Sequence, residues 1–215
     1  MNNRYHSIIN TATVAVGALL VPLLSIGTSV STWGLHLTAL ILMAIVLAAM
    51  NLQWQQRWLL LMAGVLAIVG SFANWTLLPL AIAQIVLALL ITTQDMQPPL
   101  KATSLIAQIA FLQVLITMAG TQVLTRTFIM QLIFTTIPFI VAAWSSKLPV
   151  WLTAIIIVAL AATGYFLQVL TILVALLTII WALLPLRLPE KMPTWYWALA
   201  VPVLGFVLQL TILHG

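Results

Sequence analysis

The chain contains no cysteine and only two carboxylates, Asp95 and Glu190, among its 215 residues. The lack of cysteine excludes thiol catalysis, thiolate metal sites and disulfides. With so few carboxylates, a carboxylate metal centre and a Ser-His-Asp arrangement both lack the acid that they need. HExxH, Walker A and dinucleotide-binding motifs are also missing from the sequence. We therefore expect a protein that is not an enzyme and that uses no metal or cofactor.

Charge of either sign is scarce. Charged residues make up 4% of the chain, against about 25% in soluble domains, and hydrophobic residues make up 64%. Together with a mean hydropathy of +1.24, this indicates a polytopic membrane protein whose main partner is the lipid bilayer. The basic residues stand singly, with no run or helix face that could follow phosphates, so we expect no nucleic-acid partner.

Nine apolar segments predict an all-α transmembrane bundle of four helical hairpins and one further helix. Several segments are only 15 to 17 residues long, near the lower limit for a bilayer core of about 30 Å. Breaks are placed at "GSFANW" (70–75) and "TGYFLQ" (163–168), because an unbroken 58–93 helix would be about 54 Å long and Gly, Asn and Gln favour turns. The predicted spans are 8–26, 32–50, 58–72, 75–93, 102–120, 128–144, 150–164, 167–186 and 195–213.

The basic residues predict the orientation of these spans. With a cytoplasmic N-terminus, six of the seven fall in cytoplasmic segments, as the positive-inside rule requires, and only Arg126 falls outside. If the two breaks are omitted, five basic residues still fall in cytoplasmic segments and two fall outside, so charge alone does not fix the number of spans. The six cytoplasmic residues are Arg4, Arg57, Lys101, Lys147, Arg187 and Lys191.

The connections are too short for a soluble domain, so residues 1–215 are expected to form one integral membrane domain. The segments "WLLLMAGVLAIVGSF" (58–72) and "WLTAIIIVALAATGYF" (151–166) share Trp-Leu and Gly-x-Phe, which would relate 8–93 to 102–186 as a weak tandem repeat and leave 195–213 unpaired. Chance similarity explains this equally well in a sequence so rich in Leu and Ala. The compact chain and short connections favour a bacterial plasma membrane.

Uncharged polar residues provide the candidate sites. Small or polar residues recur at helical spacing in four spans, and each stripe contains one glutamine. In one interpretation the stripes pack helices together, with an amide bonding across the interface for about 1–2 kcal/mol. In the other they line a cavity for a solute. The stripes are Ala81, Gln84, Ala88 and Thr92; Ala110, Gln113, Thr117 and Gly120; Gln131, Thr135, Pro138 and Ala142; and Ala198, Pro202, Gly205 and Gln209.

The predicted topology places several polar residues in the outer third of the membrane, which suggests a polar vestibule open to the outside. Arg126 would be available there to an anionic ligand or lipid headgroup, or would simply snorkel at a helix end. The vestibule residues are His36, Asn74, Arg126, Gln131, Gln168 and Gln209, with Gln113 deeper. The candidate ligand-binding residues are Gln84, Gln113, Gln131, Thr135, Gln209 and Arg126.

Two functions follow from these patterns. The first is a small permease or ligand-binding transport component for a neutral, lipid-like or weakly anionic solute, with an outward-facing cavity. The alternative is a non-catalytic structural subunit whose stripes pack against partner chains of a larger membrane complex. No span contains a charged residue away from its ends, which disfavours ion-coupled transport. The short connections leave no room for a nucleotide-binding motor, so the energy for active transport would have to come from a partner, such as a separate energising subunit, or from a gradient. A cavity near Gln113 and Gln131 would favour the permease, and an uncovered small-residue face would favour the subunit.

Overall fold

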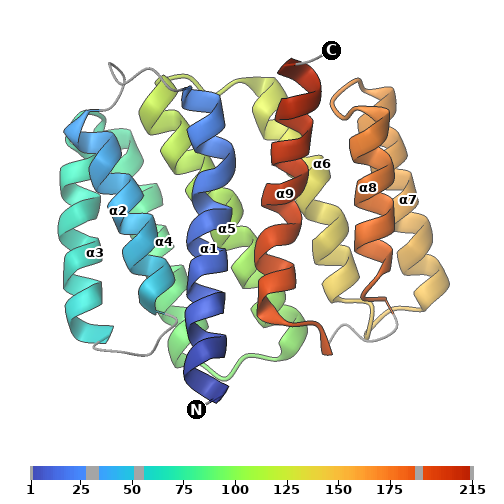
Figure 1. Ribbon diagram of the computed structural model, residues 1–215, viewed down its shortest axis with the longest axis horizontal. Coiled ribbons are helices and arrows are strands. Elements are labelled where there is room, and N and C mark those ends of the chain that lie inside the picture. Colours follow the sequence, from blue (N-terminus) through green and yellow to red (C-terminus); the bar gives the residue numbers. More distant parts are fainter. Residues whose placement is uncertain (1, 28–33, 51–55, 187–190, 214–215) are drawn as a thin grey trace. The chain divides into compact units, whose positions relative to one another are not determined.

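The computed structural model describes residues 2–27, 34–50, 56–186 and 191–213, and this part of the chain is helical, without strands (Figure 1). The all-α fold class is therefore confirmed. A short 3-10 helix, η3 (Trp75–Leu77), precedes α4. The α-helices of the described residues are α1 (Asn2–Ile26), α2 (Leu35–Ala49), α3 (Gln56–Ser71), α4 (Leu78–Thr93), α5 (Pro98–Thr121), α6 (Arg126–Ala143), α7 (Val150–Phe166), α8 (Ile172–Leu183) and α9 (Thr194–Leu213).

The break predicted at "GSFANW" is present between α3 and α4. The side chain of Asn74 caps η3, because its Oδ1 accepts a hydrogen bond from the backbone N–H of Thr76 at 3.2 Å. The hydroxyl of Thr76 donates to the same oxygen at 2.6 Å. Pro79 follows in the first turn of α4, where the missing N–H leaves no helical bond unmade. The chain therefore reverses at residues whose local chemistry favours a turn.

The break predicted at "TGYFLQ" is also present, but the turn is longer than expected. Gln168 adopts a left-handed conformation with φ of 56°, and the N–H of Leu170 donates to the carbonyl of Gly164 at 3.0 Å. Thr171 then caps α8 by accepting a hydrogen bond from the N–H of Val174. Because the turn and its cap occupy these residues, α8 begins at Ile172 rather than at 167. Its 12 residues extend about 18 Å, less than the thickness of a bilayer core.

Helix length divides the described elements into two groups. The shorter apolar helices are α2, Arg57–Ser71 of α3, α7 and α8, each with 10–17 residues. The chain is therefore compatible with membrane insertion, and five segments reach full spanning length. The segments long and apolar enough to cross a membrane are Ile8–Ile26, Trp75–Thr93, Pro98–Thr121, Arg126–Ala143 and Thr194–Ile212.

The contacts divide the chain into two compact units. Unit 1 comprises Met1–Asp95 and Gln108–Leu124, and unit 2 comprises Met96–Ala107 and Thr125–Gly215. Within unit 1, α2 packs against α1, α3 and α4. Within unit 2, α6 contacts α7, α8 and α9, and α8 also contacts α7 and α9. Consecutive helices run in opposite directions inside each unit, as their short connections require (Figure 1).

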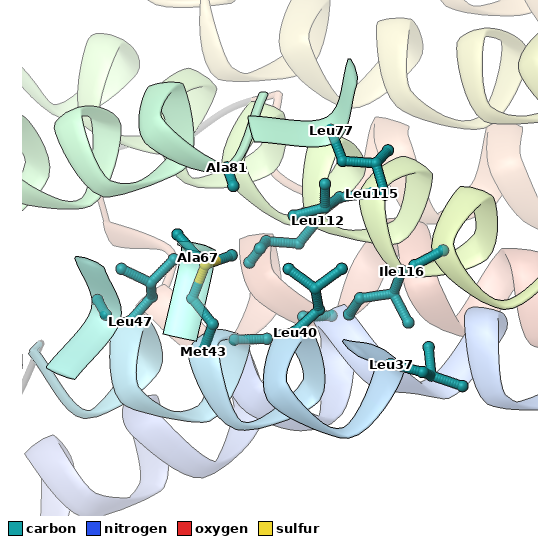
Figure 2. Packing of buried hydrophobic residues seen from close by; sticks show 14 of the residues in the cluster. Leu37, Leu40, Met43, Leu47, Ala67, Leu77, Ala81, Leu112, Leu115 and Ile116 are labelled. Carbon is teal, nitrogen blue, oxygen red and sulfur yellow. The ribbon is translucent and has the colours of Figure 1, made fainter. Parts of the chain in front are cut away.

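The core of unit 1 forms where α2, α4 and α5 meet (Figure 2). Leu40, Met43 and Leu47 follow one another at helical spacing on α2 and are fully buried. Leu112 of α5 and Ala81 of α4 belong to the same cluster and are also fully buried. Alternation of large and small side chains lets these helices approach closely, as is typical of membrane interfaces.

Two glycines of α3 differ in what surrounds them. A Cβ added to Gly70 would lie 2.5 Å from Cγ of Leu40 and 3.3 Å from the carbonyl oxygen of His36. A Cβ added to Gly64 would meet nothing within 4 Å. Gly70 is therefore needed for the close approach of α3 to α2, whereas Gly64 is not.

We predict that Gly70→Ala lowers the thermal unfolding temperature of the purified chain, because the new methyl group overpacks the contact with α2 at a cost of about 1–3 kcal/mol. Gly64→Ala is the matched control on the same helix and is expected to leave the unfolding temperature unchanged or to raise it slightly. Equal effects of the two substitutions, measured by thermal unfolding in detergent, would contradict the packing described for Gly70.

Candidate functional site

A groove of about 510 Å³ lies in unit 2. Its walls come from the first turns of α6, the end of α7, the turn between α7 and α8, and the last turns of α9. Ligand sites of small molecules have volumes of about 300–1,000 Å³, so the groove is of suitable size. The lining residues are Thr127, Gln131, Tyr165, Phe166, Gln168, Val169, Leu170, Thr171, Leu208 and Ile212.

The lining of the groove is polar in part and apolar in part. Amide and hydroxyl groups are provided by Gln131 and Gln168 and by two threonines, and the lining contains no Lys, Arg, Asp or Glu. Leu170 and Leu208 are buried and form an apolar part. Tyr165 is partly exposed, so an aromatic ring is also available at this site. The groove can therefore hydrogen-bond an uncharged polar group and at the same time cover an apolar one.

Backbone conformation is unusual at one lining residue. Gln168 is exposed and left-handed, which costs energy for any residue other than glycine. Gly164 allows the turn to fold back, because a Cβ there would lie 2.8 Å from Cδ1 of Leu170 and 3.2 Å from Cγ of Phe134. The hydroxyls of Thr171 and Thr211 lie 3.4 Å apart, which links the turn to α9. Close packing thus fixes the turn that carries Gln168, which lines the groove.

Unit 2 contains four of the predicted ligand-binding residues, but only Gln131 lines the groove. Thr135 is buried one turn further along α6, and its hydroxyl donates to the carbonyl of Gln131 at 2.8 Å. Arg126 is exposed at the first position of α6, next to the lining residue Thr127. Gln209 is half-buried and follows the lining residue Leu208. These three residues adjoin the groove without lining it.

Unit 1 contains the other two predicted ligand-binding residues. The side-chain amide of Gln113 is buried, and its Nε2 donates to the backbone carbonyl of Gly17 on α1 at 2.9 Å. On the same stripe, a Cβ at Gly120 would lie 2.4 Å from Cδ1 of Ile26, so this face packs closely against α1. Gln84 is also buried, and its Oε1 has no hydrogen-bond partner among the described residues.

The remaining vestibule residues are distributed over both units. Gln168 shares the groove with Gln131, as the vestibule hypothesis requires of these two. His36 and Asn74 belong to unit 1, where Asn74 caps η3. Tyr165, Phe166 and Thr171 line the groove but were not among the predicted vestibule residues. Their only signal in the sequence is their position beside the break "TGYFLQ", where a turn can bring side chains together.

Comparison with models of protein families, with curated proteins and with solved structures finds no match to this chain. Within the described residues, no group of three or more His, Cys, Asp or Glu side chains could hold a metal ion. The chemistry of the groove itself is therefore the basis for a functional proposal.

We predict that Gln113→Met lowers the unfolding temperature, because the carbonyl of Gly17 loses its interhelical donor; bonds of this kind contribute about 0.6 kcal/mol and at most about 1.7 kcal/mol within membranes. Gln94→Met is the matched control, since Gln94 is exposed at the end of α4. Thermal unfolding in detergent would contradict the role assigned to Gln113 if both variants unfolded at the same temperature as the parent chain.

Proposed function

We propose that the chain is a small permease or ligand-binding transport component of the membrane, which binds a neutral or weakly anionic amphiphile in the groove of unit 2. The observation that carries this proposal is the mixed lining, in which amide and hydroxyl groups lie beside buried aliphatic side chains without any formal charge. A ligand with a polar headgroup and an apolar chain matches both parts of such a lining.

The polar part favours a headgroup that both donates and accepts hydrogen bonds, since an amide group and a hydroxyl each offer both functions. The rings of Tyr165 and Phe166 are adjacent, with centroids 5.8 Å apart, and can cover the apolar side of a headgroup. Arg126 stands beside the groove and could attract a weak negative charge, although it does not line the groove.

The charges support the proposed orientation in each unit separately. In unit 1, Arg4 and Arg57 lie in the first turns of α1 and α3, at the same end of the unit (Figure 1), and the connecting segments at the opposite end contain no lysine or arginine. In unit 2, Lys101, Lys147 and Lys191 lie at one end and Arg126 at the other. We propose a cytoplasmic N-terminus, nine membrane helices in four hairpins plus one, and an outward-facing groove. Arg187 lies outside the described residues.

The alternative function, a structural subunit, receives less support from the packing. That function requires small-residue faces that partner chains would cover. Ala81, Gln84 and Ala88 on α4 are already buried, and so are Pro138 and Ala142 on α6. The stripes thus contribute to packing inside the chain, whereas the groove stays open to a ligand.

Orientation is testable because the natural chain has no cysteine. We predict that a membrane-impermeant maleimide added to intact cells labels Ala73→Cys of unit 1 and Leu167→Cys of unit 2, since both positions are exposed at the end proposed to face outward. Gln94→Cys and Ser146→Cys are exposed at the opposite ends and should react only after the cells are opened. Labelling of the second pair in intact cells would contradict the proposed orientation.

Ligand binding is testable at the two left-handed glutamines. We predict that Gln168→Gly raises the unfolding temperature, because glycine adopts this conformation without strain, at a net gain in stability of about 1 kcal/mol or less. The same substitution should reduce the amount of amphiphile that the chain retains, because it removes an amide from the groove. Gln122→Gly is the matched control, since Gln122 has φ of 58° but does not line the groove. It should keep the ligand, but its gain in stability should be smaller, because the substitution also removes the hydrogen bond that Nε2 of Gln122 donates to the carbonyl of Ala119 at 3.0 Å.

The measurement is native mass spectrometry after gentle extraction from the membrane in which the chain is produced, with Gln131→Leu as a second groove variant. The parent chain and Gln122→Gly should retain one amphiphile, and both groove variants should lose it at least in part. Equal retention by all four chains would contradict the groove as the binding site. A protein bound in stoichiometric amount, without any amphiphile, would favour the subunit.

A further inference from the structure

Two glutamines of unit 1 occupy matching positions on α4 and α5. Gln84 continues the buried stripe of Leu77 in η3 and Ala81 in α4, and Gln108 continues the buried stripe of Leu112 and Leu115 on α5. Figure 2 shows these apolar residues of the two helices in a single cluster. Because residues three and four apart share a helix face, both glutamines lie on the faces that α4 and α5 present to this cluster.

The depth of the two glutamines also agrees. Gln84 precedes the end of α4 at Thr93 by nine residues, and Gln108 follows the start of α5 at Pro98 by ten. At 1.5 Å per residue, each lies about 14 Å from the connection between the helices. The two helices run in opposite directions (Figure 1), so a similar number of turns separates each glutamine from the connection between the helices.

Each of these side chains is 1% exposed and has a polar atom without a hydrogen-bond partner among the described residues. The two atoms are complementary, because Oε1 of Gln84 is an acceptor and Nε2 of Gln108 is a donor. Buried polar atoms of native proteins are nearly always bonded, either within the protein or to enclosed water. Each of the two atoms therefore needs a partner that the described side chains do not supply.

We propose that Gln84 and Gln108 form a buried binding site in unit 1 for one small uncharged molecule, which donates a hydrogen bond to Oε1 of Gln84 and accepts one from Nε2 of Gln108. Water has this chemistry and is the smallest such guest. Ala81 and Ala88 stand one turn on either side of Gln84 and have no side-chain atoms beyond Cβ. The site is independent of the groove in unit 2.

The first test measures whether the two positions face each other, with cysteine pairs introduced into the natural cysteine-free chain. A short bifunctional methanethiosulfonate should join Gln84→Cys to Gln108→Cys, and it should also join the reference pair Ala81→Cys and Leu112→Cys. A cross-linker is used because a guest between the two amides holds the backbones further apart than a disulfide can span. Val86→Cys with Gln108→Cys is the negative control, because Val86 is exposed on another face of α4. A reference pair that is joined while the glutamine pair is not would overturn the placement.

The second test detects the guest itself, with water as the probe. Water-edited solid-state NMR of the full chain in lipid should show transfer of proton magnetisation from water to the side-chain amide of Gln108. The signal of this amide is assigned by its absence in Gln108→Met. The transfer should disappear in Gln84→Met and persist in Gln113→Met, which removes a different buried amide. Transfer that is absent in the parent chain, or unchanged in Gln84→Met, would overturn the proposal. The side-chain amide of Gln94 is the positive control, because Gln94 is exposed and its amide should receive magnetisation from water in every variant.

Discussion

A helix in hydrocarbon has to satisfy its polar groups within the protein, and several polar side chains on the apolar helices of this chain are bonded in that way. Threonine hydroxyls donate to the carbonyl one turn earlier in their own helix, as Thr92 does to Ala88 at 2.9 Å and Thr178 does to Val174 at 2.7 Å. The hydroxyls of these threonines are thereby bonded within their own helices. Contact between helices then depends on small residues, which allow two backbones to approach each other. Packing at positions such as Gly70 then determines which helices can become neighbours.

Glutamine has a longer side chain, so its amide can reach beyond its own helix, and the structure uses that reach in different ways. Gln113 bonds the backbone of α1 and fixes an interface inside unit 1. Gln131 and Gln168 line a groove, where their amides are available to a ligand. Gln84 and Gln108 are buried with complementary atoms unbonded within the described residues. The stripe glutamines Gln84, Gln113 and Gln131 thus differ in chemistry because their surroundings differ.

Much of the fold could be predicted from the sequence, because hydropathy, helical spacing and turn-forming residues are local signals. The helices, the breaks at "GSFANW" and "TGYFLQ" and the burial of the stripe around Gln84 all follow from such signals. The candidate site was harder to predict from the sequence, since its formation depends on Gly164 packing against Phe134 and on a left-handed Gln168. The bond from Gln113 to Gly17 joins residues 96 positions apart, which no spacing rule specifies. Spacing could not show the division into two units either.

The central claim is that the groove of unit 2 binds an amphiphile rather than a protein partner. Photo-cross-linking in the intact membrane tests this most directly, with a benzophenone amino acid in place of Ile212, which lines the groove and is exposed. We expect an adduct whose mass is that of the chain plus one small amphiphile, and its yield should fall when Gln131→Leu is added. An adduct with a second protein chain, unaffected by Gln131→Leu, would contradict the account.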